Sequence, residues 1–245
     1  MPEHSTWAGG RGGLLGRDRS RRCQFSPPTF ARMQYGDFSH FVAPPGYKST
    51  TVFDGWTTTV IGGGGGTLVL LDRVGGWLQL ISAAVEDQGI QMQSLGEAFL
   101  PAADRDIHFG CSIRSNDVTE NDIFVGLSAT NATLVSVPDA DLIGYWTHDG
   151  DANLDFQVQA AASAVAAVDT GVDLADNIAI ELGFMVNGLT SVHTYINGVE
   201  DATFAIAAVA DIPLVELRPS FAVLTGEGAS NTLEIDWFSI VQNYV

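Results

Sequence analysis

Lysine is almost absent from this chain, and basic residues of either kind are few. Lys48 is the only lysine, and the 245 residues carry 11 lysines and arginines against 29 aspartates and glutamates, a formal net charge of −18. A chain this acidic repels nucleic acid and anionic membranes. We therefore expect neither among its partners.

Long apolar runs are also missing. No stretch reaches the roughly 18 apolar residues that a membrane-spanning helix needs, and residues 1–30 contain no apolar core of a signal peptide. Synthesis in the cytoplasm without a signal peptide is therefore expected. The only two cysteines, Cys23 and Cys111, lie far apart. We expect two thiols, with a disulfide as the alternative.

The few basic residues are concentrated at the start of the chain. Residues 1–48 hold seven basic and three acidic residues, a net charge of +4, whereas the remainder holds four basic and 26 acidic residues, a net charge of −22. Glycine-rich and arginine-rich stretches and two Pro-Pro pairs favour an extended backbone over a packed core. The sequence therefore predicts an arm over residues 1–49 and a folded domain over residues 50–245.

Arginines and spaced apolar side chains are the features with which this arm would bind a partner. That partner is either a neighbouring subunit or, as the alternative, the arm's own domain. The expected partner-binding residues are Arg11, Arg17, Arg19, Arg21, Arg22, Phe25, Phe30, Met33, Tyr35 and Phe38.

Residues 50–245 alternate between short apolar-patterned stretches and turn signals. Asn197-Gly198, between two strand-like stretches, is a strong signal for a two-residue hairpin. Strands spaced by roughly 8–12 residues are typical of a β-sandwich. Only the alanine-rich run 160–168 favours a helix, and we expect a strand edge or a brief helix there.

The last strand is expected over residues 231–241. Its alternation places Leu233, Ile235 and Trp237 on one face and Glu234 and Asp236 among the residues on the other. A strand at the end of the chain that pairs into the middle of a sheet implies a non-local, Greek-key topology.

Several motifs resemble, in their order along the chain, the concanavalin A-like lectin/glucanase jelly roll, and more narrowly its version in structural proteins of tailed bacteriophages. They cover about residues 50–245. They are Gly75-Gly76-Trp77-Leu78-Gln79-Leu80, Asp106-Ile107-His108-Phe109, Asp122-Ile123-Phe124-Val125-Gly126-Leu127, Thr194-Tyr195-Ile196-Asn197-Gly198 and Leu233-Glu234-Ile235-Asp236-Trp237.

This resemblance implies an all-β jelly-roll sandwich that works as a rigid surface module of a virion. A capsid decoration (cement) protein is the first expectation, holding the head together through its arm. The implied partners are the major capsid protein and neighbouring copies of the chain, and the implied location is the capsid surface after synthesis in the host cytoplasm. The alternative is a lectin-like module that attaches to surface glycans.

Two acidic motifs are candidates for chemistry. Glucanases of this fold carry E-x-D-x-E, with three carboxylates on one face of a strand, but here Phe238 follows Glu234 and Asp236 in place of the third. The spacing of acids over 149–155 suits Ca²⁺, yet Leu154 and Ala160 stand where a calcium-binding EF-hand loop needs glycine and glutamate. A hairpin turn held by Asp and Asn side chains is the simpler interpretation.

No histidine pair has metal-ligand spacing, and the tryptophans on predicted strands are expected in the core rather than stacked on sugars. We therefore expect no enzyme activity, no catalytic residue, no metal site and no cofactor.

Overall fold

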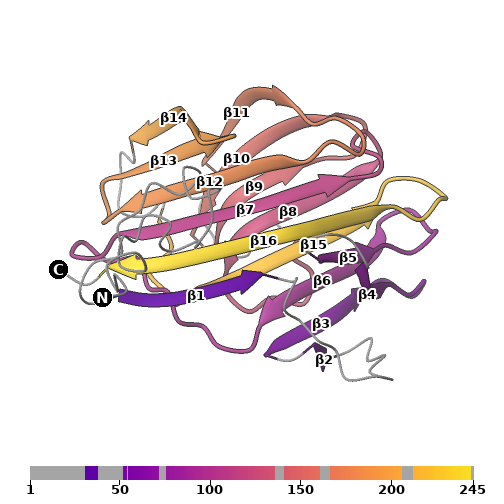
Figure 1. The fold of residues 1–245 in the computed structure, drawn as a ribbon, viewed down its shortest axis with the longest axis horizontal. Helices are drawn as coiled ribbons and strands as arrows, with labels where there is room; N and C mark the ends of the chain where they lie inside the picture. The colour runs from indigo at the N-terminus through magenta and orange to yellow at the C-terminus, as the bar shows by residue number, and fades with distance from the viewer. Residues whose placement is uncertain are drawn as a thin grey trace, which may run out of the picture.

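The computed structural model describes residues 31–37, 52–53, 55–71, 76–135, 141–160, 166–205 and 212–243. Every regular element in these ranges is a β-strand, and the strands form two antiparallel sheets (Figure 1). The prediction of an all-β jelly-roll sandwich is confirmed. Within the same ranges no helix is long and apolar enough to cross a membrane.

Sheet A contains the C-terminal strand near its middle. Its order is β14 (Val199–Ala205), β13 (Ser191–Ile196), β12 (Ile180–Asn187), β7 (Ile107–Ser115), β16 (Thr232–Asn243), β5 (Trp77–Ile81) and β4 (Thr67–Leu71), with β1 (Ala31–Asp37) also paired to β16. Strands distant in sequence are therefore neighbours, as β16 is to β7 and β5. The predicted non-local pairing of the last strand is confirmed.

Sheet B has the same kind of non-local order. It runs β11 (Ala166–Asp173), β10 (Asn153–Gln159), β9 (Leu142–Thr147), β8 (Asn121–Ser128), β15 (Arg218–Thr225), β6 (Gln88–Ser94), β3 (Trp56–Ile61) and β2 (Val52–Phe53). Strand β15 lies between β8 and β6. The chain thus crosses repeatedly between the two sheets, and each sheet depends on both halves of the sequence.

Aromatic side chains fill much of the space between the sheets. Phe109 and Phe184 of sheet A stack with ring centroids 4.9 Å apart, and Phe156 of sheet B meets Phe184 edge-on at 5.4 Å. The hydroxyl of Tyr145, from β9, donates to the carbonyl of Gly183 at 2.7 Å on sheet A. Burial raises the pKa of this hydroxyl, so it remains protonated and ties the two layers together.

A β-bulge in β16 changes which residues face the core. The register shifts between Ile235 and Trp237, so Asp236 is an extra residue. Phe238 and Ile240 therefore join Leu233 in the core, whereas Trp237 does not. The prediction that Trp237 shares a face with Leu233 and Ile235 is wrong, because strict alternation ends at the bulge.

Part of the predicted arm is a strand of sheet A. Residues 31–37 pair antiparallel with residues 237–243 of β16, and Figure 1 shows β1 lying along that strand. The rest of residues 1–49 lies outside the described residues. The boundary between arm and domain stays a prediction.

The predicted hairpin turn at Asn197-Gly198 is confirmed. Strand β13 ends at Ile196 and β14 begins at Val199, with Asn197 and Gly198 at φ values of 51° and 78°. These values suit a tight two-residue turn between antiparallel strands. In the alanine-rich run, residues 166–168 begin strand β11. Residues 161–165 lie outside the described part.

Candidate functional site

The outer face of sheet B, the face turned away from the core, is the candidate site. Successive side chains along a strand point to opposite faces of the sheet. A residue that directly precedes or follows a core residue in the same strand therefore points to the outer face. Ile123, Val125 and Leu127 of β8 belong to the core. The outer face of β8 and of its neighbour β9 therefore carries Asp122, Phe124, Gly126 and Ser128 from β8, and Leu142, Gly144 and Trp146 from β9.

Two glycines lie opposite each other at the centre of this face. Gly126 pairs with Gly144 across β8 and β9. A Cβ atom on Gly126 would lie 2.3 Å from the carbonyl oxygen of Ile143, and one on Gly144 would lie 2.5 Å from that of Val125. The close approach of the two backbones therefore requires glycine at both positions.

A second, smaller hydrophobic cluster covers the centre of the outer face. It consists of Phe124, Leu134, Leu142, Trp146 and Ala222, with Val135 packed against it. Leu134 does not come from the sheet but from residues 129–135, which follow β8. We call this segment the covering loop. The centre of the outer face is therefore occupied by the chain itself.

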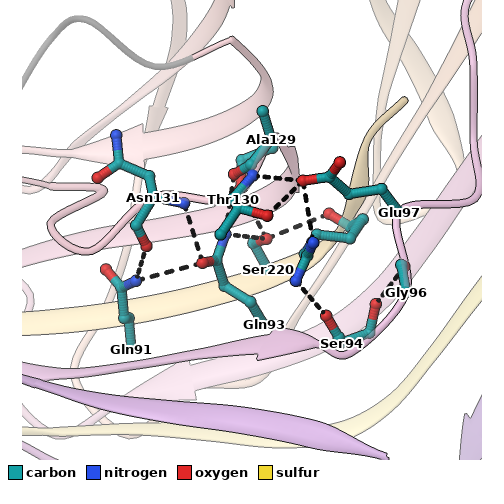
Figure 2. Close-up of polar contacts among 11 residues, drawn as sticks. Gln91, Gln93, Ser94, Gly96, Glu97, Ala129, Thr130, Asn131 and Ser220 are labelled. Carbon is teal, nitrogen blue, oxygen red and sulfur yellow. Dashed lines mark hydrogen bonds and ion pairs between the residues drawn. The ribbon is translucent and has the colours of Figure 1, made fainter. Parts of the chain in front are cut away.

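Two glutamines of β6 hold the covering loop by its backbone (Figure 2). The side-chain oxygen of Gln91 accepts a hydrogen bond from the N–H of Leu134 at 2.9 Å, and that of Gln93 accepts one from the N–H of Asn131 at 3.2 Å. The Gln93 amide also donates to the carbonyl of Ala129 at 3.0 Å. Since both glutamines are buried, these bonds satisfy polar groups that would otherwise be costly.

An ion pair fixes the other side of the covering loop. The Glu97 carboxylate lies 2.9 Å from the Arg218 guanidinium and accepts hydrogen bonds from the N–H and the hydroxyl of Thr130. Burial alone would raise the pKa of Glu97, but the Thr130 hydrogen bonds and the Arg218 charge outweigh it and lower the pKa. Glu97 therefore stays ionised when the loop is in place.

A cluster of polar and aromatic residues lies at one end of the outer face. His148 stacks on Trp146 with ring centroids 5.5 Å apart, and its Nδ1 lies 3.9 Å from Oδ1 of Asp122. Burial raises the pKa of Asp122, and burial also raises that of Asp155 on β10. Asp122 also accepts a hydrogen bond from the N–H of Asp149 at 3.0 Å, so it helps to hold the start of the following turn.

The acidic turn 149–155 joins β9 to β10 as a hairpin. Gly150 has a φ of 82°, the Asp151 carboxylate accepts from the N–H of Asn153 at 3.0 Å, and the Asn153 amide donates to Asp155 at 3.2 Å. These bonds are those of the expected turn held by Asp and Asn side chains. Within the described ranges, no group of three or more His, Cys, Asp or Glu residues has the arrangement of a metal site.

Glu234 and Asp236 lie on sheet A, the sheet that does not carry the candidate site. Glu234 forms an ion pair with Arg114 at 2.5 Å and accepts a hydrogen bond from Gln79 at 2.9 Å. Asp236 is the extra residue of the bulge. Glu234 therefore has structural partners in both neighbouring strands, Arg114 in β7 and Gln79 in β5.

Most residues predicted to bind a partner lie outside the described part of the chain. Only Met33 and Tyr35 fall within it, in β1, where their Cα atoms pair with those of Val241 and Ser239. Their role stays a prediction. Cys111 is buried in β7 as a thiol, while Cys23 is outside the described residues.

Sequence reasoning missed the covering loop and the residues that hold it. The one signal in the sequence is Gln91-Met92-Gln93, which puts two glutamines on the same face of a strand. Buried glutamines at alternate positions indicate a polar partner above the sheet.

No protein-family model matches the sequence, and no curated protein matches it either. Solved structures do resemble the fold. An endo-1,3-beta-glucanase from Streptomyces sioyaensis has a TM-score of 0.62 at 10% identity, covering 89% of this chain and 99% of its own. A protein of unknown function from Shewanella oneidensis MR-1 has a TM-score of 0.61 at 12% identity, covering 90% of both chains. An endo-beta-1,4-glucuronan lyase from Trichoderma reesei has a TM-score of 0.56 at 10% identity, covering 80% of this chain and 94% of its own.

These likenesses show the fold, a concanavalin A-like jelly roll that other proteins use to act on carbohydrates. They also correct one expectation. We expected no enzyme activity because the third carboxylate was missing beside Glu234 and Asp236. A glucanase and a lyase share the fold, so the fold is compatible with catalysis, and the gap in one motif of sheet A is no ground for excluding it.

Proposed function

We propose that this protein is a structural component of a tailed-bacteriophage virion, a capsid decoration protein that stabilises the head through its N-terminal arm. The observation that carries the proposal is the pairing of β1 with β16. A segment of the basic N-terminal region is thereby anchored to the acidic domain, and the residues before it start from a fixed point on the sandwich.

The covering loop supports the same proposal. The outer face of sheet B buries Leu134 and satisfies the backbone of residues 129–134 with Gln91 and Gln93. A face closed by its own chain suits a rigid module. The uneven distribution of charge also supports the proposal. An arm with a net charge of +4 can bind an acidic shell while a domain with a net charge of −22 faces solvent.

Two deletions test the arm. Removing residues 1–30 keeps β1, whereas removing residues 1–49 also exposes the edge of β16. Each variant is mixed with capsids that lack the protein, and co-sedimentation is measured. We expect the shorter deletion to leave a folded domain that no longer sediments with capsids. Normal sedimentation of that variant would contradict the arm's role.

The second candidate function is carbohydrate binding at the end of the outer face. There the half-exposed ring of His148 stacks on the buried Trp146, and the Asp122 carboxylate lies beside it, so His148 supplies the aromatic surface and both side chains supply hydrogen-bonding groups. Such combinations suit sugars, which present both apolar faces and hydroxyls. A glycan array separates the two candidates, because a capsid decoration protein that uses only its arm gives no glycan signal.

A further inference from the structure

One edge of β16 pairs with β7, and the other edge pairs with two strands, one after the other along its length. Strand β5 pairs with residues 232–235, and β1 pairs with residues 237–243. Without β1, alternate residues along this seven-residue edge would present unpaired backbone N–H and C=O groups. The β16 residues there, among them Phe238, Ile240 and Gln242, are buried. An exposed edge of this kind is a template for another strand.

Within the described residues, β1 has β16 as its only strand partner. The next strand in the chain, β2, is at the far edge of sheet B. Residues 38–51 join the two, a connection that spans up to about 50 Å when extended. Nothing in the pairing of β1 itself therefore restricts which copy of the chain supplies it.

We propose that β1 is exchanged between copies, so that residues 31–37 of one copy pair with residues 237–243 of its neighbour. Main-chain hydrogen bonds provide the affinity in strand addition, and they are the same whether the strand comes from the same copy or another. Exchange of an identical element is a low-cost route to oligomers. The second copy is the partner that fits, because it carries a strand already matched in length and register.

The exchange also has a consequence for the arm. Residues 1–30 precede β1, so they are carried with it onto the neighbouring copy. Each domain is then linked to the next by a strand rather than by contact between two rigid surfaces. This exchange involves only contacts among copies and does not depend on the surface that the assembled copies cover.

Disulfide trapping tests the exchange. Tyr35 and Ser239 lie opposite each other, and the Cα atoms of facing residues in an antiparallel pair are about 4.5–5.5 Å apart, a separation that a disulfide spans. In a Cys23→Ser background, Tyr35→Cys and Ser239→Cys chains with different tags are co-expressed and oxidised. We expect a disulfide-linked heterodimer that reducing agent removes. The pair Ala31→Cys and Asn243→Cys, also directly opposed, repeats the test at the end of the strand.

Two control experiments accompany the disulfide trapping. Tyr35→Cys co-expressed with Val199→Cys, an exposed residue of β14, should give no heterodimer. A single chain with both cysteines at 35 and 239 measures pairing within one copy. If that chain closes its disulfide while the two single-cysteine chains stay unlinked, β1 is not exchanged. If neither pair of positions forms a disulfide in any arrangement, the pairing of β1 with β16 is itself wrong. Binding to capsids is measured separately, so either result leaves that test intact.

Discussion

Glu97 shows how one side chain can hold a segment in place. Its carboxylate is bound by Arg218 and Thr130, and its pKa lies below the ordinary value of 4.5. A group whose pKa is lowered on folding stabilises the protein above its unfolded pKa, and the stabilisation is lost as the pH falls through the folded value.

Glu97→Gln should therefore destabilise the protein at pH 7 by about 1–2 kcal/mol, since the mostly buried Arg218 loses its counter-charge. The difference from the unmodified protein should shrink as the pH falls below 4.5 and through the lower pKa that Glu97 has in the folded protein, where its carboxylate becomes protonated. Denaturant unfolding at several pH values measures this, with the exposed Glu86→Gln as the control. A difference that does not change with pH would show that the ion pair is not responsible.

Gly144 is a position where the backbone alone dictates the residue. Gly144→Ala should destabilise the protein by about 1–3 kcal/mol, because the new methyl group would overlap the carbonyl of Val125. Gly228→Ala is the matched control, since a Cβ atom there has no neighbour within 4 Å. Equal midpoints of urea unfolding for the two variants would contradict the close approach of β8 and β9.

The covering loop is the element that distinguishes the outer face of sheet B. Leu134 is its only contribution to the fully buried part of the second cluster, so the loop should open without unfolding of the sandwich. Leu134→Ala should speed amide hydrogen exchange at residues 131 and 134. It should lower the free energy of global unfolding less than Leu80→Ala, which removes a core side chain and should cost about 2–5 kcal/mol. Equal losses in both variants would mean that loop and sandwich unfold together.

At the scale of elements, the sequence predicted those whose signals are local. The Asn197-Gly198 turn needs only two residues that tolerate positive φ, and it was found. The bulge at Asp236 was missed because the extra residue is defined by the register of β16 against β7, which no single strand reveals. The covering loop was not predicted for the same reason. The position of Leu134 depends on packing against side chains from three strands, β8, β9 and β15.

At the scale of the whole molecule, the sequence predicted the jelly roll because its motifs recur in a set order. It did not predict that β1 would add to sheet A, since strand addition depends on main-chain groups rather than on particular side chains. The expectation of no catalysis failed because it used one motif of sheet A to judge the entire fold. The carboxyl groups with raised pKa values, Asp122 and Asp155, are on sheet B.

The central claim is that the acidic sandwich is fixed to a capsid by its basic N-terminal arm. Quantitative mass spectrometry of purified phage particles tests it most directly. The account predicts the protein in intact heads, in a fixed ratio to the major capsid protein, and its release at high salt, which screens the attraction of a basic arm for an acidic shell. Particles that lack the protein, in preparations where the infected cell contains it, would contradict the account.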